Sequence, residues 1–169
     1  MHLFIYSLGP GVLLRVLTPG GFFSLTAFLA AAALLQVEPL IRELAGSGGL
    51  IWSQTLIGPL AAAGLIAWPG RDFIGSCRRL GWKTLRPHFR GRPDLGPPSR
   101  EALFNGALAG GLVCLLFAAL TGTAEAPFWP VRPDNPLAQA LSPGRVQRLS
   151  ALFWPLSLVL WGFRHGSGR

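Results

Sequence analysis

Residues that could do chemistry are few in this chain of 169 residues, and they do not form a known catalytic motif. All seven acidic residues lie outside the longest apolar stretches, and the three histidines lie near the two ends of the chain and in a basic segment. Patterns for a nucleophile elbow, a zinc-protease helix and a phosphate-binding loop are missing from the sequence. The spacing of the histidines also disfavours a haem-ligating pair. We therefore predict no catalytic residue, no metal site and no cofactor.

The two cysteines are isolated from each other and from other metal-binding residues. Cys77 lies in the basic segment, Cys114 lies in the middle of an apolar run, and neither has a partner at CxxC spacing. A zinc site lacks ligands, and a disulfide between two such different environments is implausible. We interpret both as ordinary thiols.

Positive charge is concentrated in one segment, since eight of the fifteen basic residues lie between Arg71 and Arg100. Pro87 divides this segment into an amphipathic first half, suited to a membrane surface, and an irregular second half rich in Gly and Pro. Anionic lipid headgroups are the simplest ligand, and a cytosolic partner is the alternative. Nucleic acid is not expected, because no aromatic stacking platform accompanies the charge. The residues predicted to make such contacts are Arg78, Arg79, Lys83 and Arg86.

The composition around this segment is that of a membrane protein. Half of the residues are hydrophobic and only 13% are charged, whereas about a quarter of the residues in soluble domains are charged. The mean hydropathy is +0.44. We predict an all-α membrane protein, a small polytopic bundle of about four transmembrane helices that forms a single domain over residues 1–169. The predicted spans are residues 20–37, 49–68, 102–122 and 149–163, with a cytoplasmic basic loop at 69–101 and an external Pro-rich loop at 123–148.

These four segments differ in quality as spans. Residues 149–163 cover only about 22 Å at 1.5 Å per residue, against a hydrocarbon core of roughly 30 Å, so an interfacial or re-entrant helix is the alternative there. Residues 1–19 are apolar but contain Gly9, Pro10, Gly11 and Arg15. We predict that they form an N-terminal interfacial or kinked lead-in segment rather than a span.

Polar side chains cluster in the second predicted span. This span contains Pro59, and we predict a kink near Gly58 and Pro59 because a proline inside a helix removes a hydrogen bond. Such uncharged polar groups are typical of hydrogen bonding between helices, and lining a solute path is the alternative. The residues of this possible polar path are Ser53, Gln54 and Thr55 of the second span and Asn105 of the third.

Small residues recur every fourth position along the third predicted span. In lipid, such a face allows another helix to approach closely and gain dispersion contacts. We predict that it packs within the bundle or against a partner subunit. The face consists of Ala102, Gly106, Gly110, Cys114, Ala118 and Gly122.

The distribution of Lys and Arg predicts the orientation. Cytoplasmic loops carry the excess of positive charge, so the basic loop is expected in the cytoplasm. Four spans then place both termini there, in a multi-pass protein of the bacterial cytoplasmic (inner) membrane.

Three functions are compatible with these observations. The leading hypothesis is a non-catalytic scaffold, assembly factor or accessory subunit that contacts membrane lipids and other membrane subunits, or associates with itself. The alternative is a permease or channel component for a small neutral solute, since ion and proton pumps normally keep a carboxylate within the membrane. The third is an enzyme that acts on lipid headgroups, with Asp72, His88, Asp94 and Glu101 as its acid-base groups.

Overall fold

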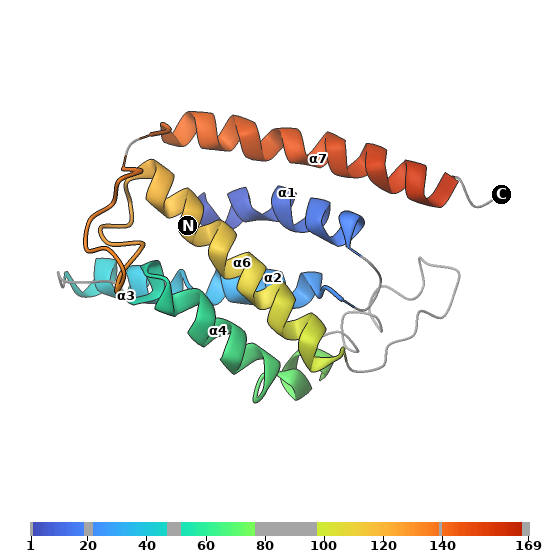
Figure 1. Cartoon of the computed structure of the whole chain (residues 1–169), viewed down its shortest axis with the longest axis horizontal. Coiled ribbons are helices and arrows are strands. Elements are labelled where there is room, and N and C mark those ends of the chain that lie inside the picture. Colours follow the sequence, from blue (N-terminus) through green and yellow to red (C-terminus); the bar gives the residue numbers. More distant parts are fainter. Residues whose placement is uncertain (1, 19–21, 47–51, 77–97, 139, 167–169) are drawn as a thin grey trace.

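The chain folds into helices joined by turns, and the part of it that the structure describes contains no β-strand. The structure is a computed structural model that describes residues 2–18, 22–46, 52–76, 98–138 and 140–166 (Figure 1). The predicted all-α class is therefore confirmed. The elements are α1 (His2–Leu17), α2 (Leu25–Leu34), α3 (Val37–Ala45), the 3-10 helix η1 (Trp52–Gln54), α4 (Ile57–Ala67), α6 (Arg100–Thr121) and α7 (Pro143–Gly166).

Helix α6 is central, because it packs against α2 and α4 and also touches α1. Helix α1 lies between this group and α7, which contacts α1 extensively and α6 only slightly (Figure 1). Six of the eleven buried residues of the core between α2, α4 and α6 are alanine, and the other five are Leu35, Ile66, Ile74, Leu103 and Cys114. Small side chains therefore bring these three helices close together.

Proline sets the break between α2 and α3. Ser24 caps α2, since its Oγ accepts a hydrogen bond of 3.2 Å from the Ala27 N–H. The helix ends at Leu34, and α3 begins at Val37, so that Pro39 is the third residue of α3. A proline has no N–H to donate to the carbonyl four residues earlier, and its ring collides with that carbonyl, which here belongs to Leu35. In the first turn of a helix, however, a proline is tolerated. The predicted helix at 20–37 is thus interrupted by a turn at residues 35–36 and continues as α3 to residue 45.

Pro59 acts in the same way at the start of α4. The helix begins at Ile57, and Pro59 is its third residue. The predicted kink near Gly58 and Pro59 is therefore wrong, because the proline lies where a missing N–H costs nothing. The polar stretch before it forms η1 and a turn, so the segment predicted as one helix at 49–68 contains a regular α-helix of 11 residues.

Helices α6 and α7 are the longest helices that the structure describes. Helix α6 is capped by Ser99, whose Oγ accepts a hydrogen bond of 3.1 Å from the Ala102 N–H, and it ends at Gly122 in the left-handed conformation (φ 74°). Helix α7 has 24 residues, with Pro155 inside it. It covers about 36 Å, so the predicted limit of fifteen helical residues at 149–163 is wrong.

Helix α1 is part of the bundle. It runs without interruption through Gly9, Pro10 and Gly11, all three of which are buried. A Cβ added at Gly11 would lie 2.6 Å from the ring of Phe28 on α2. Gly11 therefore lets α1 pack closely against α2, and the irregular sequence predicted as an interfacial or kinked lead-in forms a helix within the bundle.

The Pro-rich loop after α6 closes one end of the bundle. Asn135 donates hydrogen bonds of 2.9 Å to the carbonyl oxygens of Ala119 and Ala124, which ties the loop to the end of α6. The ring of Trp129 meets that of Trp52 edge to face, with centroids 5.0 Å apart. Trp129 therefore connects the loop to η1, and Asn135 connects it to the end of α6.

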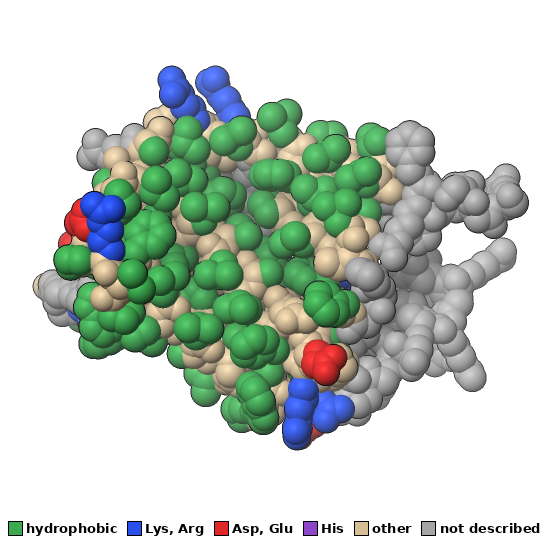
Figure 2. All heavy atoms as spheres, in the orientation of Figure 1, with side chains coloured by type: hydrophobic (Ala, Val, Ile, Leu, Met, Phe, Trp, Pro, Cys, Tyr) green, Lys and Arg blue, Asp and Glu red, His purple; other side chains and the backbone are tan. Residues whose placement is uncertain are grey.

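Among the described residues, two helical segments are long and apolar enough to cross a membrane, Leu25–Arg42 and Arg100–Thr121. A buried helix of a soluble protein would pass the same test. The outer surface adds a second observation, because apolar side chains cover much of the face in Figure 2 while the charged groups lie toward its edges.

Candidate functional site

A small pocket lined by both polar and apolar residues lies where α2 breaks, and it is the candidate for a site in the described part of the chain. It opens between the turn at residues 35–36, η1 and α6. Polar groups from all three elements converge there in a core that otherwise consists mostly of alanine. Its lining residues are Leu35, Gln36, Ser53, Gln54, Cys114, Leu115 and Ala118.

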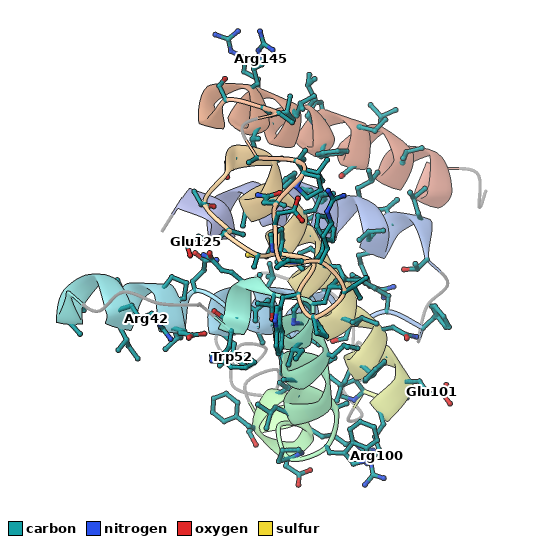
Figure 3. All side chains as sticks on the ribbon, turned by 60° about the vertical axis from the view of Figure 1, so that its left-hand side comes forward. Arg42, Trp52, Arg100, Glu101, Glu125 and Arg145 are labelled. Atoms are coloured by element: carbon teal, nitrogen blue, oxygen red, sulfur yellow. The ribbon has the colours of Figure 1, made fainter. Side chains whose placement is uncertain are left out.

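Glu38 holds η1 against the first turn of α3. Its Oε2 accepts a hydrogen bond of 2.7 Å from the Ser53 N–H, and its Oε1 accepts one of 3.2 Å from the Trp52 N–H. Arg42, one turn along α3, forms an ion pair of 3.1 Å with the same carboxylate. The carboxylate therefore satisfies the free N–H groups at the start of η1, a favourable position for negative charge. Figure 3 shows Arg42 and Trp52 at this end of the bundle, away from Arg100 and Glu101.

Gln36 connects the break in α2 to α6. Its Nε2 donates a hydrogen bond of 3.1 Å to the Sγ of Cys114. Cys114 is 2% exposed and is a free thiol. Sulfur is a weak acceptor, so this contact orients the amide of Gln36 more than it stabilises the fold.

Two buried oxygen atoms at the pocket lack hydrogen-bond partners among the described residues, namely Ser53 Oγ and Gln54 Oε1. The Ser53 hydroxyl lies beside the Glu38 carboxylate but without the geometry of a hydrogen bond. The amide oxygen of Gln54 is the clearer case. Buried polar groups are almost always paired, and an unpaired one costs about 1–3 kcal/mol.

The pocket is small. It has about 180 Å³ of empty space, part of which is open to the surface. The space in it that a water-sized sphere can occupy is at the lower limit for one water molecule. The described residues contain no group of three or more His, Cys, Asp or Glu side chains that could hold a metal ion. The Cys114 thiol at the pocket accepts a hydrogen bond from the Gln36 amide, which is not a base and so does not activate it.

The four residues of the predicted polar path do not come together. Ser53 and Gln54 line the pocket, but the Thr55 hydroxyl is fully buried and donates to the carbonyl of Trp52 at 2.8 Å. Asn105 lies two to three turns from Cys114 along α6 and donates to the carbonyl of Phe22 at 3.3 Å. The structure therefore gives a local pocket rather than a continuous path through these four side chains.

The small-residue face of α6 is covered by α2. A Cβ at Gly106 or Gly110 would come within 2.2 Å of the carbonyl oxygen of Ser24 or Phe28, respectively. Ala102, Cys114 and Ala118, which belong to the same face, are buried. Gly122 does not belong to it, because it is exposed and serves as the left-handed C-cap of α6.

The predicted contact residues of the basic loop lie outside the described residues. This holds for Arg78, Arg79, Lys83 and Arg86, and also for Cys77, His88 and Asp94. Of the acid-base groups considered for a lipid-headgroup enzyme, Asp72 and Glu101 are described, and both are exposed.

Sequence reasoning missed Gln36 and Glu38. Each looked like an ordinary polar residue at the end of an apolar run. Pro39 was the available signal, because a proline shortly after such a run predicts a helix break that exposes polar backbone and side-chain groups.

Comparison with known proteins gives no relative from which a function could be transferred. No protein-family model matches the chain, and neither the curated proteins nor the solved structures contain a significant match.

Proposed function

We propose that this chain is a multi-pass integral membrane protein that acts as a non-catalytic scaffold, assembly factor or accessory subunit of a membrane complex. The observation that carries the proposal is a reversed distribution of side-chain size. Alanine and glycine make many of the helix contacts, alongside a few large buried side chains such as Phe28 and Leu103, whereas many large aliphatic side chains lie on the surface.

The contrast is clear on α4 and α7. Ala63 is fully buried, while Leu65 is 55% exposed and Leu152 on α7 is 64% exposed. In water, burying such a side chain is worth about 1.5–3 kcal/mol, so soluble proteins place large aliphatic residues inside. In lipid this drive between helices disappears, and close contact through small residues replaces it. The surface shown in Figure 2 is therefore suited to acyl chains.

The basic loop supports an orientation for this bundle. It joins residues 76 and 98 at the end of the molecule where α7 terminates, opposite the start of α1 (Figure 1). On the positive-inside rule, this end faces the cytoplasm of a bacterial inner membrane. Since α1 packs within the bundle, we now propose that it adds a crossing, which puts the N-terminus outside and the C-terminus inside. This replaces the expectation that both termini are cytoplasmic.

The surface for a partner subunit is then not the small-residue face of α6, because α2 already covers it. The outward residues of α7 are the better candidates. They recur at helical spacing and include Leu149, Leu152, Leu156 and Val159.

The second candidate function is a permease component for a small neutral solute. The pocket with Ser53 and Gln54 favours it, because unpaired polar atoms in an apolar core are typical of a ligand site. The satisfied side chains of Thr55 and Asn105 weigh against a long path.

One purification distinguishes the two candidates. The tagged chain is extracted from its native membrane into lipid nanodiscs, and the mass of the particle is measured. A scaffold is expected in a complex larger than the 18.1 kDa chain, and the double variant Leu152→Ala/Leu156→Ala should release the chain without unfolding it. The matched control is Leu60→Ala/Leu65→Ala, which removes the same atoms from the exposed surface of α4.

A different result would replace the scaffold with the permease. A chain that is isolated alone and moves small neutral solutes into liposomes, with flux lost in Gln54→Ala but not in Asn105→Ala, would contradict the scaffold proposal.

A further inference from the structure

We infer that α3 is an interfacial helix, whose exposed apolar face inserts into the outer leaflet of the bilayer where the lipid headgroups meet the acyl chains. The inference rests on the proposed function, because it needs the bundle to lie in a membrane. It goes further by assigning a partner, the phospholipid surface, to a helix that makes little contact with the rest of the bundle. The crossing that contains α2 then ends at the turn at residues 35–36 and does not continue through α3.

The two faces of α3 are the reverse of those of a helix on the surface of a soluble protein. Two of its charged side chains are turned toward the bundle, since Glu38 binds two N–H groups of η1 and pairs with Arg42. The Arg42 side chain is only 25% exposed, whereas Leu44 is 80% exposed. The exposed residues recur at helical spacing on one face, and all are aliphatic. This apolar stripe consists of Val37, Leu40, Ile41 and Leu44.

The apolar stripe needs a partner, because α3 is too short to remain helical alone. It has nine residues and ends at Gly46 in the left-handed conformation (φ 62°). Helices shorter than about 12–15 residues are marginal in water, and in proteins most of their stability comes from packing of an apolar face. The main contacts of α3 are with η1 and with α2. In Figure 3 the helix, which carries Arg42, projects beyond the rest of the bundle. The burial that supports α3 therefore comes from outside the bundle.

A lipid surface fits the apolar stripe better than a protein does. A helix of nine residues is about 13 Å long and about 10 Å wide. One face of it therefore offers far less than the roughly 800 Å² per partner of a stable protein interface. Protein interfaces are also enriched in aromatic residues, Met and Arg, and the stripe contains none of these. Insertion of an amphipathic helix into lipid has no such minimum, since binding scales with the apolar area that is buried.

The neighbours of α3 indicate the depth at which it lies. Leu34, the last residue of α2, is exposed and precedes Val37 by three residues, so the stripe continues the apolar surface of α2. Trp52, whose N–H is bound by Glu38, is half exposed. Tryptophan is enriched at the level of the headgroups. The first turn of α3 therefore lies at this level, where an apolar face inserts by about 5–10 Å.

The test measures the depth of single nitroxide labels on the full chain in liposomes of phosphatidylethanolamine and phosphatidylglycerol. In a Cys77→Ser/Cys114→Ala background, Leu40→Cys and Leu44→Cys each place one label on the stripe, one turn apart. Collision rates with oxygen and with a water-soluble nickel complex, obtained by power saturation, give the depth of each label. Both labels are expected at the same depth, about 5–10 Å into the boundary between headgroups and acyl chains.

Two labels elsewhere distinguish a failure of this inference from a failure of the proposed function. Leu65→Cys, on the exposed surface of α4, is expected among the acyl chains. Arg145→Cys, exposed near the start of α7, is expected in water (Figure 3). A label at Leu65 that reads as aqueous would refute the membrane protein itself, and the inference with it.

A second measurement needs no label on α3. Amide hydrogen exchange is followed in the same liposomes, and Leu40→Ser/Leu44→Ser makes the stripe polar. This variant is expected to speed exchange in α3 on the order of tenfold, because the short helix then frays. The matched control is Leu60→Ser/Leu65→Ser, which changes two exposed leucines of α4 and is expected to leave exchange in α3 unchanged.

With the Leu65 label among the acyl chains, any of four results would overturn the inference. Aqueous readings at both Leu40 and Leu44 would place α3 in water. Depths that differ by about 6 Å, the rise of four helical residues, would show that α3 continues the crossing. Labels shielded from both oxygen and nickel would show that a protein covers the stripe. Unchanged exchange in α3 of Leu40→Ser/Leu44→Ser would show that lipid does not support the helix.

Discussion

At the scale of single residues, two glycines determine how closely α6 approaches α2. Gly106 and Gly110 are one turn apart, and each faces a backbone carbonyl that is one turn from the other on α2. A backbone neighbour cannot rotate away as a side chain can. These positions therefore tolerate even a methyl group poorly.

We predict that Gly110→Ala destabilises the protein. The added Cβ would lie 2.2 Å from the Phe28 carbonyl oxygen, so α6 and α2 must separate. Overpacking of this kind costs about 1–3 kcal/mol of the free energy of unfolding. The measurement is denaturant unfolding in a mild detergent, followed by circular dichroism.

Gly64→Ala is the matched control. Gly64 also lies inside a helix, but nothing lies within 4 Å of a Cβ there. Alanine is a better helix former than glycine by about 1 kcal/mol, so this variant should be neutral or more stable. Equal losses in both variants would show that the contact of α6 with α2 is not the cause.

The sequence was informative about these residues only in part. Spacing of four residues singled out Gly106 and Gly110, because small side chains at this period share one helix face. It could not identify α2 as the helix they face, since a periodic pattern carries no information about its neighbour. It also could not separate Gly122, whose backbone conformation ends the helix, from the glycines that pack.

At the scale of elements, two prolines break what the hydropathy pattern joins. Pro39 and Pro59 each occupy the third position of a helix, so each marks a start rather than a kink. Hydropathy measures only the apolar content of a segment, so it does not show that a new helix begins at Val37 or at Ile57. The pocket arises because the broken ends of two apolar segments meet beside the same part of α6.

We predict that Glu38→Gln loosens η1. The substitution removes the charge and leaves one side-chain acceptor for two N–H groups. Loss of a charge-assisted hydrogen bond costs about 1.5–3 kcal/mol. Faster amide hydrogen exchange at Trp52 and Ser53, together with a lower melting temperature, is the expected result.

Arg42→Gln is the comparison for this prediction. Arg42 contributes a partly exposed ion pair to the same carboxylate, and such pairs are worth about 1 kcal/mol or less. Its effect should be smaller than that of Glu38→Gln. A larger effect would mean that the ion pair, rather than the hydrogen bonds to η1, holds the segment.

At the scale of the whole molecule, the crossing that we propose for α1 would change the topology expected from hydropathy. The segment looked too irregular to count as a span because of its two glycines, its proline and Arg15. In the structure the glycines are packing positions, and the helix runs alongside α7 within the bundle. An irregular sequence thus becomes a regular helix once a neighbour is available to pack against.

We predict that reporters fused to the two ends of the chain lie on opposite sides of the membrane. A C-terminal fluorescent protein should fold in the cytoplasm, and an N-terminal tag should be accessible to a protease in intact spheroplasts. A reporter inserted after Arg86 should read cytoplasmic. Finding both termini inside would remove the crossing that we assign to α1.

Helix α1 depends on α7, which is synthesised after all the other described helices. These two helices pack extensively against each other, while α7 barely touches the rest of the bundle. During synthesis, α1 therefore stays without its main neighbour until the ribosome has passed all the other described helices. Such contacts between distant parts of a sequence form late in folding. A chain that stops at Ser142 would leave one face of α1 uncovered, and membrane proteases could use that face to recognise and remove incomplete copies.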